Sequence, residues 1–517
     1  MWIKAAASVL LPGMLSGVLS GVLSGAALAD APLSAIDWLS QSLSLPQAVA
    51  LPKTSVGGVI ATPDVTVQSL GLPVPDAIGI LSTKVTGLPR NLWGDAPAAE
   101  IERLINDASP DNLPALQGLL TTLLLAEADA PVDSGPAPQV LLTRIDKLLA
   151  LGALDQAHAL IEAAGPASSP DMFRRAFDTA LLVGEENRSC AVLAASPGLS
   201  PALPTRIFCL ARAGDWDAAA LTLDTATALG QVDAEQSDLL NRFLDPEVAE
   251  QGKTPAPPVP VTPLDMKIFA SIGAPLPSAT LPIAFSHADL SPDQGWKPRI
   301  EAAERLARVG VIPPNLLLGI YTEQKPAASG APWDRTAAFQ KLDAAVEAGD
   351  GTASARALPA AWSAMQSVEL EVPLAELFAA KLAKLPLAGE ARQIATTLAL
   401  LSSAYESLVA ASTPQNAREA FLFGIARGKL DTLAPPDAMG RAISAAFTAP
   451  LVPDDIAPLL ANGRVGEALL MAMTKINRGA SGDLPQVAAG LATLRKLGLE
   501  DVARRTALQL MLLERRG

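Results

Sequence analysis

Apolar residues in this chain recur at the spacing of amphipathic helices, and one short pattern marks the points where pairs of helices turn. From residue 96 onward the apolar positions follow the helical period. Within these stretches a Leu is followed four residues later by Gly and nine residues later by Ala. The four copies are Leu148, Gly152 and Ala157; Leu210, Gly214 and Ala219; Leu459, Gly463 and Ala468; and Leu494, Gly498 and Ala503.

Each copy of this pattern predicts a helical hairpin. Glycine adopts the left-handed conformation that ends a helix at least cost, and a small Ala in the next helix lets two backbones approach closely. The turn at residues 214–219 resembles the turn of a tetratricopeptide repeat (TPR), with Asp215 as the expected N-cap. The sequence therefore predicts an all-α fold: an α-solenoid of TPR-like helical hairpins with an extended N-terminal arm.

Further helices are expected on both sides of these copies, and Asp171 is expected to cap the one over 171–183. The periodicity predicts them at 140–151, 155–164, 171–183, 186–195, 204–213, 216–229, 299–309, 335–348, 359–368, 374–384, 389–411, 415–426 and 438–447. The last two copies of the pattern are expected to form hairpins over 459–476 and 491–514.

Two proline-rich segments divide the chain. Residues 30–95 contain prolines too often for a long helix, which predicts an extended arm that either caps the solenoid or docks a partner. Residues 251–263 contain the run TPAPPVPVTP, which favours a semi-rigid polyproline spacer. This linker separates an N-terminal helical half, 96–250, from a C-terminal half, 264–517.

The first 29 residues have the pattern of a secretory signal peptide. Lys4 precedes an apolar stretch, and Ala27-Leu28-Ala29 is a small-x-small cleavage site. We expect cleavage after Ala29 and a periplasmic mature protein with no membrane insertion. The alternative is a retained leader that anchors the chain, because the apolar stretch is long enough to span a bilayer.

The composition of the chain limits the classes of partner that it is expected to bind. Only 4% of residues are aromatic and half are hydrophobic, as in closely packed helices rich in Ala and Leu. The net charge of −14 repels nucleic acid and anionic lipid, so neither is an expected partner.

The two cysteines, Cys190 and Cys209, are expected to form a disulfide. They lie at similar distances before and after the turn at 196–203, and therefore at similar heights on two antiparallel helices. An exported protein favours such a bridge, which would contribute roughly 3 kcal/mol. The alternative is a pair of buried free thiols.

The sequence contains no motif that is typical of a catalytic, cofactor-binding or metal-binding site. The chain has two histidines, His158 and His287, and no nucleophile elbow, Walker loop or dinucleotide fingerprint. Glu406-Ser407 is the one Glu-Ser pair that could resemble a lytic transglycosylase, and no matching segment follows it. We expect no enzyme activity and no cofactor.

Several stretches resemble a family of exported alphaproteobacterial proteins of unknown function, often labelled antifreeze glycopeptide polyproteins. They are Ala77 to Leu81, Thr86 to Pro89, Asn91 to Gly94, Leu123 to Ala128, Lys147 to Ala157 and Ile207 to Cys209. The Thr-Ala-Ala arrays of antifreeze glycoproteins are absent, so the label reflects an Ala and Pro bias. The resemblance implies a bacterial envelope location and no particular activity.

These observations predict a non-enzymatic periplasmic scaffold or adaptor that binds envelope proteins. Proteins built from repeated helical hairpins usually bind other molecules rather than catalyse reactions on them. The alternative is an envelope hydrolase that acts on peptidoglycan through an unrecognised pair of carboxylates.

Overall fold

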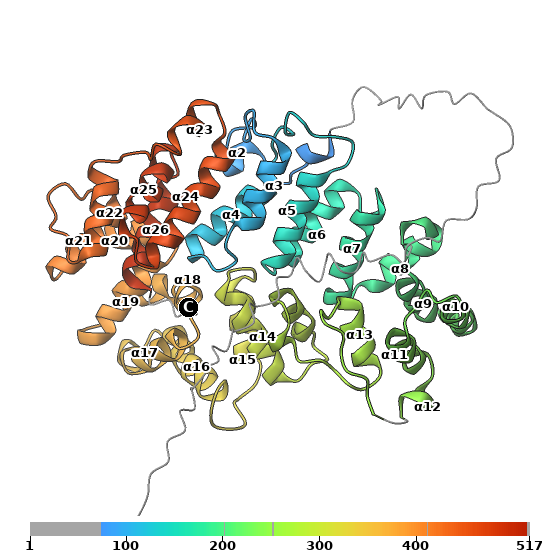
Figure 1. Ribbon diagram of the computed structural model, residues 1–517. Coiled ribbons are helices and arrows are strands. Elements are labelled where there is room, and N and C mark those ends of the chain that lie inside the picture. The colour runs from blue at the N-terminus through green and yellow to red at the C-terminus, as the bar shows by residue number, and fades with distance from the viewer. Residues whose placement is uncertain (1–73, 201, 251–252, 411, 514–517) are drawn as a thin grey trace, which may run out of the picture. The chain divides into compact units, whose positions relative to one another are not determined.

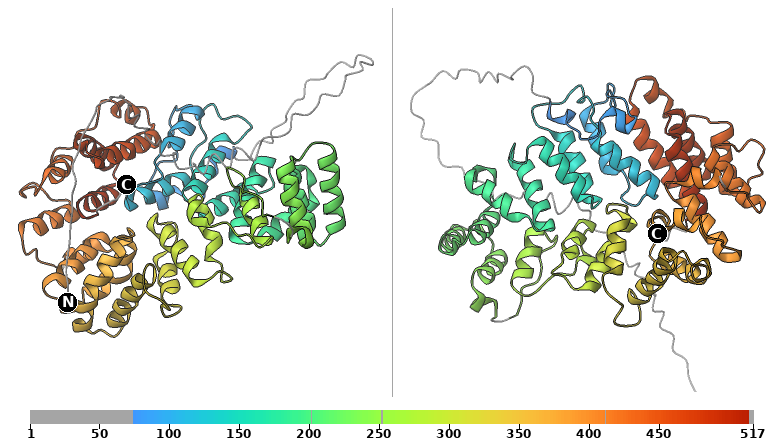
Figure 2. Two further views of the ribbon diagram at one scale, coloured as in Figure 1. Left: turned by 60° about the horizontal axis from the view of Figure 1, so that its bottom comes forward. Right: turned by 180° about the vertical axis from the view of Figure 1, so that it is seen from behind.

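A computed structural model of the chain describes residues 74–200, 202–250, 253–410 and 412–513. The predicted signal peptide and the arm up to residue 73 lie outside these residues. Every regular element in the described part is a helix, and one isolated parallel bridge joins Leu81 to Ala126. Successive helices pack against their neighbours along the chain (Figures 1 and 2). The predicted all-α fold of helical hairpins is confirmed.

The helices follow one another along the described chain. Up to the proline-rich linker they are η1 Pro75–Ala77, α2 Thr83–Thr86, α3 Ala98–Asp107, α4 Pro114–Leu125, α5 Gln139–Ala150, α6 Leu154–Ala164, α7 Pro170–Val183, α8 Glu186–Ala195, η2 Pro197–Leu199, α9 Leu203–Arg212, α10 Trp216–Ala228, α11 Ala234–Leu244 and α12 Pro246–Ala249. After it they are α13 Pro263–Ser271, η3 Ser278–Thr280, η4 Ile283–Leu290, α14 Trp296–Arg308, α15 Pro314–Thr322, α16 Trp333–Glu347, α17 Gly351–Gln366, α18 Glu371–Leu382, α19 Gly389–Leu401, α20 Tyr405–Ala410, α21 Ala417–Arg427, α22 Ala438–Thr448, α23 Ala457–Ala461, α24 Val465–Ala480, α25 Leu484–Lys496 and α26 Glu500–Leu512.

The four Leu-Gly-Ala copies share one backbone geometry. Each glycine has a φ between 71° and 85°, and the residue after it donates its N–H to the carbonyl of the motif leucine. This six-to-one hydrogen bond is the Schellman arrangement, which satisfies a carbonyl at the helix end. The alanine of each copy is fully buried in the next helix. The motif therefore specifies a helix end and the close packing that follows it.

The disulfide joins α8 to α9. Cys190 and Cys209 are bonded, their Cα atoms lie 5.1 Å apart, and both are buried. The predicted pairing is confirmed. By the chain-entropy relation the bridge contributes about 3 kcal/mol.

Some local predictions differ from the structure. The helix expected to begin at Pro359 begins at Gly351, where the side chain of Asp350 caps it by accepting the N–H groups of Thr352 and Ala353. The expected helix 389–411 is interrupted, because Ser402 is extended with a ψ of 161° and the backbone N–H and hydroxyl of Ser403 both bind the carboxylate of Glu376. The helix expected to be capped by Asp171 is instead capped by Ser169, whose hydroxyl accepts the N–H of Met172 at 3.1 Å. A side chain from a distant element and a better-placed hydroxyl override the local pattern.

Residues 74–96 form a segment that we call the N-terminal strap. Asp76 is buried, and its carboxylate accepts the backbone N–H of Leu141 at the start of α5, at 2.9 Å. Arg144, also buried, donates to the carbonyls of Ile78, Leu124 and Ala126 at 2.7 to 2.9 Å. These bonds fix the described end of the predicted arm to its own helices.

The strap and helices α3 and α4 contact the C-terminal helices α24 and α26 along a junction that we call the seam. The carbonyl of Leu92 accepts the N–H of Gly466 at 2.8 Å, and the ring of Trp93 covers Gly466 so closely that a Cβ would collide with it. Helix α24 packs against α3 and α4, and α26 packs against α4 (Figure 1). Residues from the two ends of the described chain therefore share one core.

Buried apolar side chains form two hydrophobic clusters. The first core contains residues of the strap, of α3 to α6, of α14 to α22 and of α24 to α26. The second core contains residues of α8 to α11. Helices α7 and α13 place residues in both cores. Because α13 follows the proline-rich linker and α11 precedes it, the second core includes residues from both sides of that linker.

Substitution of Gly466 by Ala tests the seam. Helix propensity favours Ala, but a Cβ at this position meets the Trp93 ring, and overpacking costs about 1–3 kcal/mol. We expect a lower melting temperature. The matched control is Gly118→Ala on α4, where nothing lies near the new methyl group and a gain of about 0.5–1 kcal/mol is expected. Equal thermal shifts for the two variants would contradict the seam.

Candidate functional site

Helix α10 presents an exposed face that combines apolar and acidic side chains. Asp215 caps the helix by accepting the N–H of Ala218 at 3.2 Å. The inward side, with Ala219, Leu223 and Ala226, is buried, and α10 packs on α9 and α11. The outward residues, which we call the α10 face, are Asp217, Ala220, Leu221, Asp224 and Ala228.

Leu221 is the central apolar residue of the α10 face. Its side chain is 68% exposed, and Asp217 and Asp224 lie one helical turn before and after it. Neither carboxylate forms an ion pair with any described residue. The face thus offers an apolar contact with an acidic group on each side. An exposed apolar side chain by itself is common on protein surfaces. The two acidic side chains beside it favour a partner that carries basic residues.

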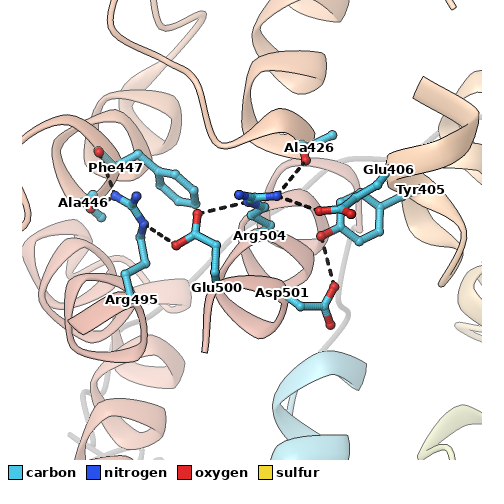
Figure 3. Close-up of polar contacts among 9 residues, drawn as sticks. All are labelled: Tyr405, Glu406, Ala426, Ala446, Phe447, Arg495, Glu500, Asp501 and Arg504. Carbon is cyan, nitrogen blue, oxygen red and sulfur yellow. Dashed lines mark hydrogen bonds and ion pairs between the residues drawn. The ribbon is translucent and has the colours of Figure 1, made fainter. Parts of the chain in front are cut away.

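A second surface feature is a polar network around the start of α26 (Figure 3). Glu500 accepts from Arg495 Nε at 2.8 Å and from Arg504 Nε at 3.0 Å, and Arg504 also donates to Glu406 at 2.6 Å. Arg495 lies over the ring of Phe447 at 4.4 Å. Burial opposes ionisation of Glu500, but the hydrogen bonds from the two arginines lower its pKa.

An open hollow of about 460 Å³ lies beside this network. Ser403, Tyr405, Glu406, Ser407 and Asp501 line it together with one alanine. The hydroxyl of Tyr405 donates to Asp501 at 3.0 Å, and burial together with the adjacent Asp501 raises the Tyr405 pKa.

The Glu-Ser pair considered from the sequence lies in this hollow. The Glu406 side chain is 62% exposed and ion-paired with Arg504, whose Nη1 atom lies 2.6 Å from Oε1 of the carboxylate.

The two histidines lie apart from this hollow. His287 on η4 contacts the carbonyl of Gly152 at 2.8 Å through Nε2, and burial lowers its pKa. His158 lies on α6. Within the residues that the structure describes, no group of three His, Cys, Asp or Glu side chains could hold a metal ion.

Neither the α10 face nor the Arg495–Glu500–Arg504 network was predicted from the sequence. The face carried a readable signal, since Asp217, Leu221 and Asp224 are spaced by four and three residues on one helix. The network carried a partial signal, because Glu500 and Arg504 are four residues apart on one helix. The contacts with Phe447 and Glu406 carried none, because these residues come from distant helices.

Comparison with known proteins adds no relative: no protein family, curated protein or solved structure matches this chain. In the described residues, no helix combines the length and apolar character needed to cross a bilayer.

Glu500→Gln tests the network around α26. Its folded-state pKa is lowered, so its ionised form stabilises the fold above the unfolded pKa, and this contribution disappears as pH falls through the folded value. We expect the variant to lose about 1–2 kcal/mol at neutral pH and the difference from wild type to shrink in acid. The control Glu301→Gln removes an exposed ion pair with Lys297 and should change stability by less than about 0.5 kcal/mol. Urea unfolding at several pH values measures both, and a pH-independent deficit would contradict the role of Glu500.

Proposed function

We propose that this protein is a non-enzymatic scaffold or adaptor of the bacterial periplasm, and that the α10 face is one of its protein-docking surfaces. The observation that carries the proposal is the exposed Leu221 between two acidic side chains on a helix whose opposite side is firmly packed. A rigid helix with a charged, partly apolar outer face is suited to binding.

The chemistry of the face defines the partner. An apolar side chain entering beside Leu221 would place Lys or Arg residues one turn away next to Asp217 and Asp224. The complementary partner is therefore an amphipathic helical segment with basic residues flanking an apolar one. The net charge of −14 would further accelerate the approach of such a segment.

The periplasmic location rests on three supports. They are the predicted signal peptide, the resemblance to exported proteins, and the Cys190–Cys209 disulfide, since disulfides persist in oxidising compartments.

A peptidoglycan-acting hydrolase is the second candidate, favoured by the two carboxylates, Glu406 and Asp501, that line one hollow. Both already have protein partners, because Arg504 holds Glu406 and Tyr405 donates to Asp501. We therefore prefer the scaffold.

Binding of a synthetic peptide tests the α10 face. The probe is a fluorescent amphipathic helical peptide of Lys and Leu, and fluorescence anisotropy gives its affinity for the mature protein. We expect Leu221→Asn to weaken binding by about five- to tenfold, as for an apolar interface residue. Substitution of Asp217 and Asp224 by Asn should weaken binding and reduce its salt dependence.

The control is Leu451→Asn, which replaces another exposed leucine in a different part of the chain. It should bind the peptide as wild type does. If Leu221→Asn and Leu451→Asn bind equally well, net charge alone attracts the peptide and the α10 face is not a docking surface.

A further inference from the structure

Asp178 on α7 is a buried carboxylate at the boundary between the two cores. Its side chain is 10% exposed, and its Oδ2 atom is inaccessible to solvent and has no hydrogen-bond partner. The closest cation is Arg174, whose Nη1 atom lies 3.7 Å from that oxygen. A buried carboxylate with an unsatisfied oxygen is energetically costly when charged and much less so when protonated.

The position of α7 gives this carboxylate a structural consequence. Met172, Ala176 and Leu182 pack in the first core, whereas Phe173, Phe177 and Leu181 pack in the second. Helix α7 also contacts α13, the other helix that places residues in both cores. Asp178 thus lies on an element that joins them.

Some of the charged groups around Asp178 form hydrogen bonds or ion pairs with other residues. Arg175 on the same helix binds Asp146 of α5 through two hydrogen bonds, and Asp265 of α13 binds Thr262. Arg174, Arg175, Asp146 and Asp265 are the groups that act electrostatically on the Asp178 carboxylate. Charged side chains on the other elements packed against α7 have other contacts: Glu162 with Arg188, Glu186 with Arg212 and Lys267, His287 with Gly152, and Asp289 with Ser278.

We propose that Asp178 is a pH-sensitive latch between the two cores. With its carboxyl protonated, α7 stays packed and the cores are held together. When the carboxyl ionises, the charge gains hydration if the packing around α7 opens, and the second core with α10 then separates more readily from the first. The latch goes beyond the proposed docking function and does not depend on it.

The pH range follows from the environment of the carboxyl. Burial raises the pKa of Asp178 to about 7, against the opposing effect of the two arginines. The folded pKa is raised above the unfolded one, so the stabilisation is complete below the unfolded value and is lost as pH rises through the folded value. The latch is therefore closed in mild acid and loosened above neutral pH.

Hydrogen exchange of the mature protein at about pH 6 and about pH 8 tests the latch. After correction for intrinsic exchange rates, linkage predicts that opening of α8 to α11 is roughly tenfold more favourable at the higher pH. Amides of α16 and α17, which belong to the first core, should change by less than about twofold.

Asp178→Asn should abolish the tenfold change in α8 to α11, because the amide has the same shape and does not ionise. The matched control Asp171→Asn, an exposed position on the same helix, should retain it. A pH response that persists in Asp178→Asn would overturn the proposal. If that variant does not fold, the wild-type comparison decides: an equal pH response in α16 and α17, or none in α8 to α11, also overturns the latch.

Discussion

The buried guanidinium of Arg144 is the interaction on which the N-terminal part of the structure depends. It donates to three backbone carbonyls, one from the strap and two from the end of α4 and the residue after it. Burial lowers its pKa to about 10, so the group remains charged at neutral pH and its hydrogen bonds stay charge-assisted. Together with the hydrogen bond from the Leu141 N–H to Asp76, this anchor holds the start of the strap against α5.

The seam then connects distant parts of the chain. Ala115 at the start of α4 donates to the side chain of Gln509 on α26 at 2.9 Å, so the last helix caps the fourth. The first core consequently extends across the seam, whereas the second core is attached through α7 and α13. The α10 face belongs to the part with fewer attachments, which is the part that Asp178 would release.

Local features of the fold were predictable, and contacts across the sequence were not. The glycine motif and the cysteine spacing predicted helix ends and the disulfide because the physics is confined to one turn or one hairpin. The arm at 30–95 was expected to be extended because of its prolines, yet the strap at its described end contains the helix α2 and is fixed by Asp76 and Arg144. Nothing in the spacing of Trp93 and Gly466 signals that they meet.

The same distinction applies to the candidate sites. The acids around Leu221 are readable from helical spacing, whereas the burial of Asp178 depends on helices α5, α7 and α13 meeting around it. Sequence patterns report which residues share a face, and only the packed structure reports which charges lose contact with water.

A cross-link between the two sides of the seam tests whether residues from the two ends of the described chain share one core. Asn112 and Asn477 come from opposite sides and share a hydrogen bond of 2.7 Å between their side chains. With both replaced by cysteine and the native disulfide intact, mild oxidation or a short bifunctional thiol-reactive cross-linker such as a bismaleimide should join them. The product should then migrate anomalously on a non-reducing gel. Two freely titratable thiols that remain unlinked in the folded protein would contradict the seam.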